Sequence, residues 1–247
     1  MIVSAESVSI VLVEPQSPGN IGMVCRAMKN MGLSRLRLVK GCDRFHPESL
    51  KFAVAAKDLL EQAEIFPDLP SALADCTLTV GTTRRHGKYR QEILSPPEVA
   101  TCLSNQAKPD CLAAIVFGRE DSGLTTDELS LCRWHATIPS AEQYGSLNLA
   151  QSVLLFCYEL GKAGNSPGGG RNMQMATSAE MESMFSQLGT CLLKIGFLNE
   201  QNPEHIMRSL RRIFFRAELD IREVSILRGM MTQIDWAVAG FDGRKRS

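Results

Sequence analysis

Hydrophobic residues in the first two thirds of the chain follow two alternating periods. Short continuous apolar runs predict buried strands, and apolar residues that recur every three or four positions predict helices. Strands are expected at 7–13, 36–39, 77–80, 112–117 and 136–139, and helices at 21–31, 48–63 and 147–160. Strands that alternate with helices predict an α/β fold with a largely parallel sheet and helices on both of its faces.

The pattern changes at Gly161. Residues 161–171 contain five glycines, one proline and no large apolar side chain, which is typical of a flexible tether. Beyond this segment the apolar spacing is only helical, with two capping-box patterns and one Asn-Pro helix start: Thr177 with Glu180, Asp220 with Glu223, and Asn202-Pro203. The sequence therefore predicts an α/β domain over 1–160, a linker over 161–172 and a small all-helical domain over 173–247.

The composition is that of an ordinary globular protein. The 247 residues are 44% hydrophobic and 22% charged, which argues against intrinsic disorder. The 27 basic and 27 acidic side chains leave a formal net charge of zero, so a polyanionic partner has to be bound by local patches. No apolar run reaches the roughly 18 residues of a membrane span, and the N-terminal segment lacks signal-peptide features. A cytoplasmic protein without membrane contact is expected.

Eight cysteines are spread along the chain. Several lie in apolar runs and none forms a Cys-x-x-Cys pair, so buried, reduced thiols are expected rather than a disulfide framework. Cys132 and His135 have the separation of two metal ligands, but no second pair matches them. No metal site is predicted.

An arginine stripe is expected in the C-terminal part. Arg208, Arg212 and Arg216 recur every four residues, with Arg211 beside them, and they predict a helix face suited to phosphate contacts. The alternative is a solvated helix face whose charges pair with nearby carboxylates.

A second basic segment, 80–90, follows a predicted strand and contains Arg84 and Arg85. Open α/β sheets bind their ligands at the carboxyl ends of strands, so this segment is a candidate binding loop. A mobile basic surface loop would have the same composition.

Two further segments rich in small residues also follow predicted strands. The first contains Gly118 and Glu120, and the second contains Ser146 and Asn148. Ser146 would cap the helix that begins there, whereas Asn148 inside a first helical turn is not explained by helix propensity. The common glycine-rich phosphate loops and the nucleophile elbow are missing, so nucleotide-binding and hydrolase interpretations lose support.

Three segments together resemble the motifs of a known family. Residues 14–32, 117–125 and 138–151 resemble, in this order, the first, second and third motifs of the SpoU/TrmH branch of the SPOUT RNA methyltransferases. Residues 210–229 resemble the C-terminal extension of the tRNA (cytidine/uridine-2′-O)-methyltransferases that act on nucleotide 32 of the anticodon loop. The resemblance extends over nearly the whole chain, apart from the linker and the last few residues.

The resemblance implies a fold and a cofactor that the hydrophobic pattern does not predict. The α/β domain would end in a deep trefoil knot, an exception to the rule that chains do not thread loops. The knot region would also form a homodimer, with active sites built from both chains. The knotted loops would hold S-adenosylmethionine, which becomes S-adenosylhomocysteine, and the implied contact residues are Gly81, Thr82, Gly118, Ile138, Ser146 and Leu147.

The resemblance also implies the residues that act on a tRNA ribose. Arg26 would carry the main catalytic role, with Asn20, Glu120, Ser146 and Asn148 completing the site. Because arginine stays protonated in proteins, we expect Arg26 to stabilise alkoxide charge or to fix a phosphate rather than to act as a base. Without the resemblance, Asn20 would be interpreted as a helix N-cap and Arg26 as a surface charge.

Three alternatives remain open. The α/β motifs indicate the chemistry and not the target, so ribosomal RNA is a second candidate substrate. An RNA-binding factor without catalysis is another, although the complete set of implied catalytic residues disfavours it. A dehydrogenase on a doubly wound sheet would require a glycine fingerprint that the chain lacks.

Overall fold

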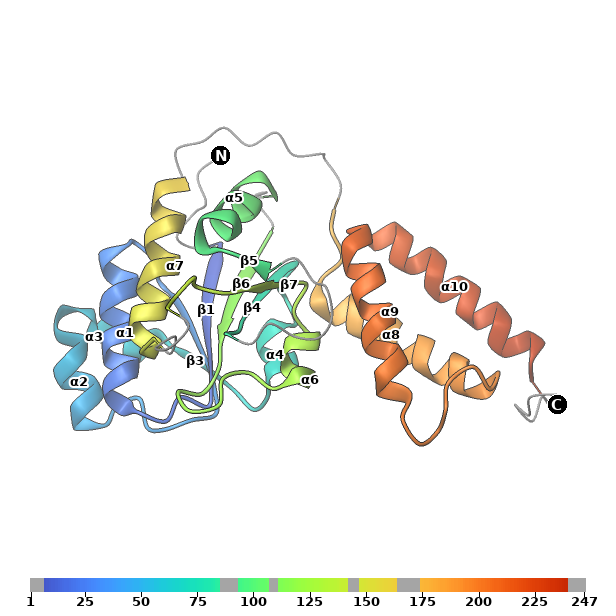
Figure 1. The fold of residues 1–247 in the computed structure, drawn as a ribbon, viewed down its shortest axis with the longest axis horizontal. Coiled ribbons are helices and arrows are strands. Elements are labelled where there is room, and N and C mark those ends of the chain that lie inside the picture. The colour runs from blue at the N-terminus through green and yellow to red at the C-terminus, as the bar shows by residue number, and fades with distance from the viewer. Residues whose placement is uncertain (1–6, 85–92, 107–110, 142–146, 164–173, 240–247) are drawn as a thin grey trace. The chain divides into compact units, whose positions relative to one another are not determined.

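The computed structural model describes residues 7–84, 93–106, 111–141, 147–163 and 174–239 (Figure 1). The chain divides into two compact units, Met1–Arg171 and Asn172–Ser247. The expected linker begins at 161, whereas the last helix of the first unit continues to Ala163, and residues 164–173 lie outside the described ranges. Among the described residues, no helix is both long and apolar enough to cross a bilayer.

The first unit is built on one parallel sheet. Seven strands in the described ranges pair in the order β3-β2-β1-β6-β4-β7-β5, and every pairing is parallel. Their bounds are β1 Val8–Val13, β2 Arg35–Val39, β3 Glu64–Phe66, β4 Leu78–Thr82, β5 Ile93–Leu94, β6 Ala113–Phe117 and β7 Trp134–Ala136. The predicted α/β class with a parallel sheet is confirmed.

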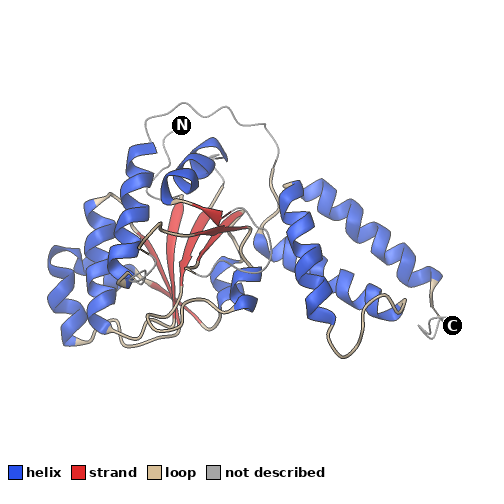
Figure 2. Cartoon of the chain, viewed as in Figure 1, coloured by secondary structure: helices blue, strands red, loops and turns tan. Residues whose placement is uncertain are grey.

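Helices cover both faces of this sheet (Figure 2). One face carries α1 (Pro18–Asn30), α2 (Pro47–Ala53), α3 (Lys57–Gln62), α5 (Pro96–Gln106) and α7 (Leu149–Ala163), and the other carries α4 (Leu69–Leu73) and α6 (Thr126–Ser130). The interior strand β1 shows why both faces are apolar: Ile10 and Leu12 pack into the larger core, whereas Val11 and Val13 pack into the smaller one. Continuous apolar runs in the sequence thus correspond to strands that are buried on both sides.

Two predicted elements differ from the structure. The single helix expected at 48–63 consists of α2, a short 3₁₀ turn over Val54–Ala56 and α3, because Val54 has a φ of 52° and the Ala55 carbonyl accepts a bond from Lys29. The apolar period continues across this break and conceals it. The strand expected at 136–139 lies two residues earlier, as β7 at Trp134–Ala136. Trp134 and His135 are half-buried, so this strand lacks the continuous apolar run of a strand that is buried on both faces.

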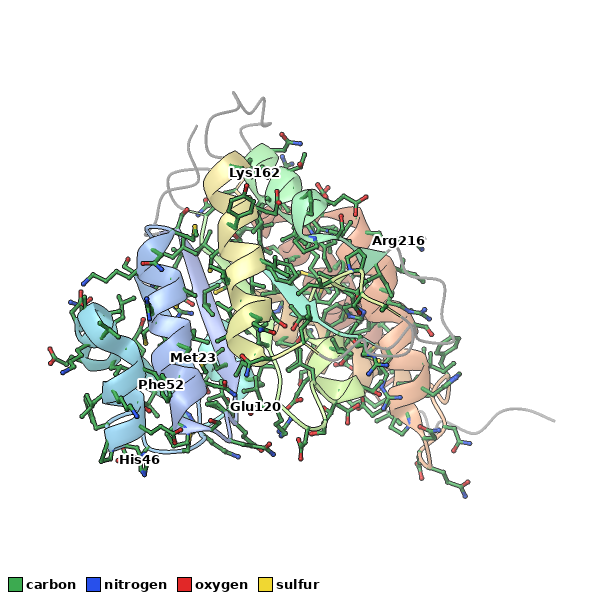
Figure 3. All side chains as sticks on the ribbon, turned by 60° about the vertical axis from the view of Figure 1, so that its left-hand side comes forward. Met23, His46, Phe52, Glu120, Lys162 and Arg216 are labelled. Carbon is green, nitrogen blue, oxygen red and sulfur yellow. The ribbon has the colours of Figure 1, made fainter. Side chains whose placement is uncertain are left out.

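Close packing of α1 on α2 depends on Gly22. A Cβ atom at this position would lie 2.2 Å from the carbonyl oxygen of Ser49 in α2, a distance at which one backbone has to move. Ser49 also donates from its hydroxyl to the Pro18 carbonyl at 2.6 Å. Met23 and Phe52 mark the two helices in Figure 3.

The second unit consists of three helices in its described part: α8 (Ser178–Lys194), α9 (Pro203–Ala217) and α10 (Ile221–Ala237). Both predicted capping boxes are confirmed, since the side chains and backbones of Thr177 with Glu180 and of Asp220 with Glu223 bond reciprocally. Methionine, phenylalanine and leucine side chains of the three helices, among them Met184 and Met207, form a separate core around Phe185.

A fully buried arginine joins the smaller core to the sheet. Arg37 in β2 is 1% exposed and donates to both carboxylate oxygens of Asp75, at 2.5 and 2.6 Å, and to the Ala72 carbonyl at 2.7 Å. Its guanidinium lies 5.5 Å from the centre of the Phe66 ring. The hydrogen bonds from Arg37 lower the pKa of Asp75, so the pair stays ionised in the folded state.

We expect Asp75→Ala to lower the free energy of unfolding by about 3 kcal/mol, because the buried charge of Arg37 loses the carboxylate that accepts two of its hydrogen bonds and keeps only the half-exposed Glu64, 3.8 Å from its Nε. The lowered pKa of Asp75 also fixes the sign of a pH effect: the ion pair stabilises the fold above the ordinary carboxyl pKa, and this contribution is lost as the pH falls. Urea unfolding at about pH 7 and about pH 3 measures both effects.

The control is Asp58→Ala, which breaks an ion pair with Lys29 whose side chains are 45% and 46% exposed. It is expected to cost less than about 1 kcal/mol. Equal losses in the two variants would contradict a special role for Arg37.

Candidate functional site

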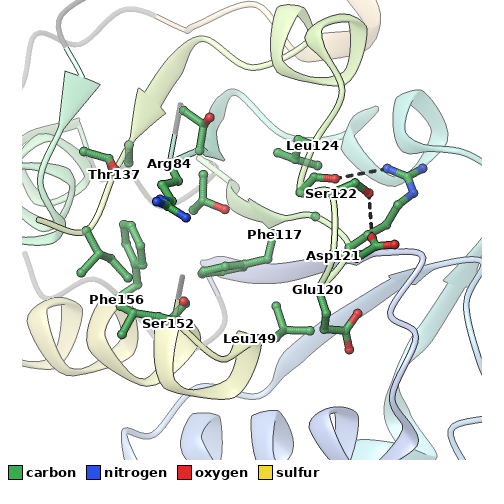
Figure 4. Close-up of a pocket in the computed structure, with 18 residues that line it drawn as sticks. Arg84, Phe117, Glu120, Asp121, Ser122, Leu124, Thr137, Leu149, Ser152 and Phe156 are labelled. Carbon is green, nitrogen blue, oxygen red and sulfur yellow. Dashed lines mark hydrogen bonds between the residues drawn. The ribbon is translucent and has the colours of Figure 1, made fainter. Parts of the chain in front are cut away.

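A pocket of about 430 Å³ lies at the carboxyl ends of β4, β6 and β7 (Figure 4). Three segments that the sequence singled out meet there. They are the segments that follow β4, β6 and β7, and the last of them continues into the beginning of α7. Its lining residues are Thr82, Thr83, Arg84, Phe117, Gly118, Arg119, Glu120, Asp121, Ser122, Gly123, Leu124, Ala136, Thr137, Ile138, Leu147, Leu149, Ser152 and Phe156. A pocket of this size accommodates a small-molecule cofactor.

The loop after β6 is held in shape by two glycines. A Cβ atom at Gly118 would lie 2.1 Å from the carbonyl carbon of Gly123, so only glycine permits this close approach. Gly123 has a φ of 72°, a conformation that glycine adopts without strain. Reciprocal backbone hydrogen bonds between Arg119 and Gly123 close the loop, at 3.3 and 2.9 Å.

Arg119 anchors this loop to two neighbouring segments. Its Nε donates to Glu14, next to β1, at 2.8 Å, and its two terminal nitrogens each donate to Glu128 in α6 at 3.0 Å. Bonds to Glu128 and then to Glu14 raise the pKa of Arg119, so it remains a cation in a structural role. The adjacent Glu120 points to a different set of partners.

The Glu120 carboxylate accepts three hydrogen bonds from the beginning of α1. The backbone N–H groups of Gln16 and Ser17 donate at 2.9 and 3.1 Å, and the Asn20 side chain donates at 2.9 Å. Burial raises the pKa of Glu120, but the bonds from Asn20, Gln16 and Ser17 lower it by more, so the net pKa lies below its ordinary value. Glu120 is therefore an ionised acceptor that orients its neighbours.

Asn20 and Asn148 extend this network to α7. The Asn20 side-chain oxygen accepts from the Asn148 amide at 2.9 Å, and the Asn148 oxygen accepts from the Ala150 N–H at 2.8 Å. Asn148 precedes the first residue of α7 and bonds to its first turn, so it occupies the capping position that the sequence suggested for Ser146. The sequence placed Asn148 inside the helix, which explains why propensity did not account for it.

The expectation that Asn20 caps α1 was wrong. The helix begins at Pro18, Ser17 is the N-cap residue, and Asn20 is buried in the first turn. Proline at the first helical position is favourable, which moves the helix start towards the N-terminus. The side chain of Asn20 is thereby free to join Glu120 to Asn148.

Apolar side chains form one wall of the pocket. Phe117 and Phe156 meet edge to face with ring centres 5.5 Å apart, and Ile138, Leu147 and Leu149 lie beside them in the lining. The other wall is formed by the hydroxyl groups of threonine and serine side chains and by the loop 118–123, which contributes charged side chains and the backbone of its two glycines. Such a lining suits a ligand with one flat apolar part and one polar or charged part.

The predicted cofactor contacts are only partly brought together. Thr82, Gly118, Ile138 and Leu147 line the pocket, and so does Arg84. Gly81 does not line it: the residue is buried in β4, where a Cβ atom would lie 3.0 Å from Cys132 Sγ and Leu129 Cδ2. Ser146 and Arg85 lie outside the described residues.

Arg26 lies apart from the pocket of its own chain. It is exposed in α1, and none of the described residues bonds or pairs with it. Sequence reasoning missed Phe117, Phe156 and Ser152 as lining residues. The two aromatic residues follow the ordinary core periodicity of their elements, and no sequence signal distinguishes them from core residues.

The arginines of α9 have different surroundings. Arg211 pairs with both carboxylate oxygens of Glu182 in α8, and its guanidinium lies 4.4 Å from the centre of the Phe185 ring. Arg208 and Arg212 are half-buried, with Arg212 donating to Ser209, and Arg216 is exposed. Arg211 thus packs α9 on α8, contrary to its expected place on an open stripe.

The described residues contain no group of three side chains that could hold a metal ion. Cys132 is buried, and burial raises the pKa of its thiol. The ring of His135 contacts the Leu129 carbonyl at 2.9 Å.

Two family models match the chain. The model described as the SpoU rRNA Methylase family matches residues 7–158, and the model of the tRNA methyltransferase TrmJ C-terminal domain matches residues 179–244. The first match contains the sheet and the pocket, and the second contains α9, α10 and all but the first residue of α8.

Similar proteins of known name and structure extend over almost the whole chain. The tRNA (cytidine/uridine/adenosine-2′-O-)-methyltransferase TrmJ of Pseudomonas aeruginosa is 35% identical, over 97% of this chain and 98% of its own. The tRNA (cytidine/uridine-2′-O-)-methyltransferase TrmJ of Sodalis glossinidius is 37% identical, over 93% and 91%. The crystal structure of TrmJ from Z. mobilis ZM4 superposes with a TM-score of 0.82 at 34% identity, over 92% and 98%.

Glu120→Gln is expected to lower the free energy of unfolding by about 2 kcal/mol at neutral pH, because a charged acceptor of three hydrogen bonds is lost. Since the folded-state pKa of Glu120 is lowered, its contribution is present above the ordinary carboxyl pKa and lost as the pH falls through the folded value. Urea unfolding between about pH 7 and pH 3 should show a flatter pH dependence in the variant.

Glu61→Gln removes an exposed carboxylate that bonds to none of the described residues and serves as the matched control. If the free energy of unfolding of Glu120→Gln falls with pH in parallel with that of the unmodified protein, the proposal that Glu120 acts as an ionised hydrogen-bond acceptor is contradicted.

Proposed function

Because this chain belongs to the SpoU rRNA methylase family and to its TrmJ group, we propose that it transfers a methyl group from S-adenosylmethionine to a ribose 2′-hydroxyl of tRNA. The observation that carries the proposal is the pocket, in which three strand-end loops meet the Glu120–Asn20–Asn148 network at the beginning of α7. We propose nucleotide 32 of the anticodon loop as the target, from the resemblance of the C-terminal helices.

The pocket lining fits S-adenosylmethionine. Ile138 and Leu147 offer an apolar surface for an adenine ring, backed by the buried Phe117–Phe156 pair. Thr82 and Ser152 offer hydroxyl groups for the polar remainder. Gly118 allows the loop after β6 to close on the backbone of Gly123, and this closed loop forms part of the pocket wall. Ser146 and Gly81 belong to the proposed contact set by resemblance; Gly81 lies within β4 next to Thr82, which lines the pocket.

The bound cofactor would supply an electrophilic methyl carbon and leave as S-adenosylhomocysteine. The ribose 2′-oxygen forms the new bond to this carbon while the electron pair of the broken carbon–sulfur bond stays on sulfur, and the hydroxyl proton passes to phosphate or water. The chain's own task is alignment and charge stabilisation. Glu120 orients Asn20 as an ionised acceptor, and Arg26 would stabilise the alkoxide or fix the adjacent phosphate.

A second copy of the chain would bring Arg26 to the pocket. Arg26 lies on α1, which packs beside α7, and α7 exposes Leu154, Leu155 and Tyr158 on one face. Apolar residues on one exposed helix face are typical of an interface. We propose a homodimer through this helix pair and the knot region, in which Arg26 of one chain completes the site of the other.

The tRNA would be bound partly by the second unit. Arg212 and Arg216 are four residues apart on α9 and support a phosphate-binding face, to which the half-buried Arg208 also belongs. Arg84 in the pocket wall is a further candidate contact, with Arg85 beside it in sequence. A trefoil knot and a cytoplasmic location remain predictions that agree with this proposal.

Incubation with labelled S-adenosylmethionine and undermodified tRNA is expected to yield a 2′-O-methyl group at nucleotide 32, mapped by nucleotide analysis. Arg26→Ala should lower kcat by at least about 100-fold, because charge stabilisation at the reacting oxygen is lost. Arg26→Lys with near-full activity would contradict a role for guanidinium geometry. Methyl transfer to ribosomal RNA alone would contradict the proposal that tRNA is the substrate. Transfer to neither RNA would contradict the proposal that the protein is an RNA methyltransferase.

Mixed dimers test whether the site is shared between chains. In Asn148→Asp, the new carboxylate can still accept from the Ala150 N–H and cap α7. It cannot donate to the Asn20 side-chain oxygen, so two acceptors then face each other. This variant should therefore also be inactive. Equal mixing of Arg26→Ala with Asn148→Asp should restore about a quarter of the activity, since half of the dimers would have one intact site. No recovery would contradict a shared site.

The double variant Arg212→Glu, Arg216→Glu is expected to weaken tRNA binding and flatten its salt dependence, because fewer counterions are released from the RNA. Binding of S-adenosylmethionine should not change. The matched control reverses two charges on another helix of the same unit, with Arg222→Glu and Arg228→Glu on α10. Equal effects of the two double variants on fluorescence-anisotropy titrations would contradict a specific role of α9.

A further inference from the structure

The loop after β2 carries an arginine stacked on an exposed aromatic ring. The guanidinium carbon of Arg44 lies 4.7 Å from the centre of the Phe45 ring, and Phe45 is 45% exposed. In the described part of the chain, Arg44 forms no hydrogen bond or ion pair, and its Nε is buried without a partner. One face of the ring is thus occupied by a cation, while a large part of the side chain remains open to solvent.

This loop is fixed next to the Glu120 network. The Cys42 N–H donates to the Pro15 carbonyl at 3.0 Å, and a Cβ atom on Gly41 would lie 2.5 Å from the Pro15 ring. The residue after Pro15 is Gln16, whose N–H donates to Glu120. Since two residues span at most about 7 Å, the Cα atom of Arg44 lies within that distance of the Cα atom of Cys42, which is hydrogen-bonded to Pro15.

Two hydrogen bonds to Asp43 hold Arg44 and Phe45 in place. The Phe45 N–H donates to the Asp43 carboxylate at 2.9 Å, and the His46 N–H donates to the Asp43 carbonyl at 3.2 Å. Figure 3 places His46 at the same edge of the unit as Glu120. Because all strands are parallel, the loops after β1, β2 and β6 open on this one edge.

An exposed aromatic ring with an adjacent guanidinium is a pair of side chains that can bind single-stranded RNA. Unpaired bases stack on aromatic faces, and arginine binds the neighbouring phosphate or stacks on the base. Helical RNA keeps its bases stacked inside and would not use an aromatic surface in this way. The pair therefore favours an unpaired loop nucleotide over a stem.

On the basis of the proposed function, we propose that Arg44 and Phe45 bind an unpaired nucleotide of the tRNA anticodon loop next to the one that is methylated. The base stacks on Phe45 and the phosphate contacts Arg44. This binding would hold the loop open at the reacting ribose, so the two residues position the substrate and do not take part in the chemical step.

Phe45→Ala is expected to raise the KM for tRNA about tenfold, because one stacked base loses its platform, while kcat and the KM for S-adenosylmethionine stay unchanged. Phe45→Trp should retain a KM within about twofold of the unmodified enzyme, since any large ring can stack. Phe45→Leu, which keeps an apolar side chain without a ring, should behave like Phe45→Ala. Ile65→Ala in β3 removes another exposed apolar side chain and is the matched control.

An equally low KM in Phe45→Leu and Phe45→Trp would overturn stacking. If the unmodified enzyme methylates tRNA and Phe45→Ala leaves its KM unchanged, this inference fails and the proposed function stands. If the unmodified enzyme transfers no methyl group to tRNA, the proposed function fails and the inference with it.

A photo-crosslinker tests the contact directly. Benzoylphenylalanine at position 45 should crosslink to an anticodon-loop nucleotide of full-length tRNA, and an excess of a single-stranded loop oligonucleotide should reduce the yield. A crosslink to the tRNA stem, or to a second protein chain alone, would overturn the proposal.

Discussion

The first unit depends on a single carboxylate that joins three segments far apart in the sequence. Glu120, in the loop after β6, accepts from the backbone at the beginning of α1, and Asn20 passes the connection to Asn148 at the beginning of α7. A half-buried carboxylate loses part of its hydration, and the hydrogen bonds from these helix ends compensate the Glu120 oxygens for that loss. The same constraint sets the shape of the pocket, because its polar wall is the loop that carries Glu120.

Much of this arrangement could be predicted from the sequence, and the missing parts share a physical cause. Strands buried on both faces produce continuous apolar runs, so β1 and β6 were predictable. The reciprocal bonds of a capping box require a fixed spacing between two residues, so the beginnings of α8 and α10 were predictable as well. Short edge elements such as β3 and β5 have no such signature. The kink at Val54 was missed because the buried face remains apolar on both sides of it.

The site was predictable only as a set of residues and not as a geometry. Asn20 has the chemistry of a helix cap, and only the contact with Glu120, a hundred positions away, gives it another role. Arg211 lies beside the arginine stripe of α9 in sequence, yet it binds a carboxylate and packs on an aromatic ring of α8. Pairing of this kind depends on partners distant in sequence, which periodicity does not report.

The order of the strands has a consequence for how the molecule reaches this state. The interior strand β1 pairs with β6, so that Val8 meets Ala113, and α7 packs against α1 although more than a hundred residues separate them. Such contacts of high sequence separation slow folding, since a long loop must close before they stabilise the chain. During synthesis the amino-terminal strand must wait for most of the first unit to emerge, and the pocket forms last. The three helices that follow make contacts closer in sequence and can fold faster.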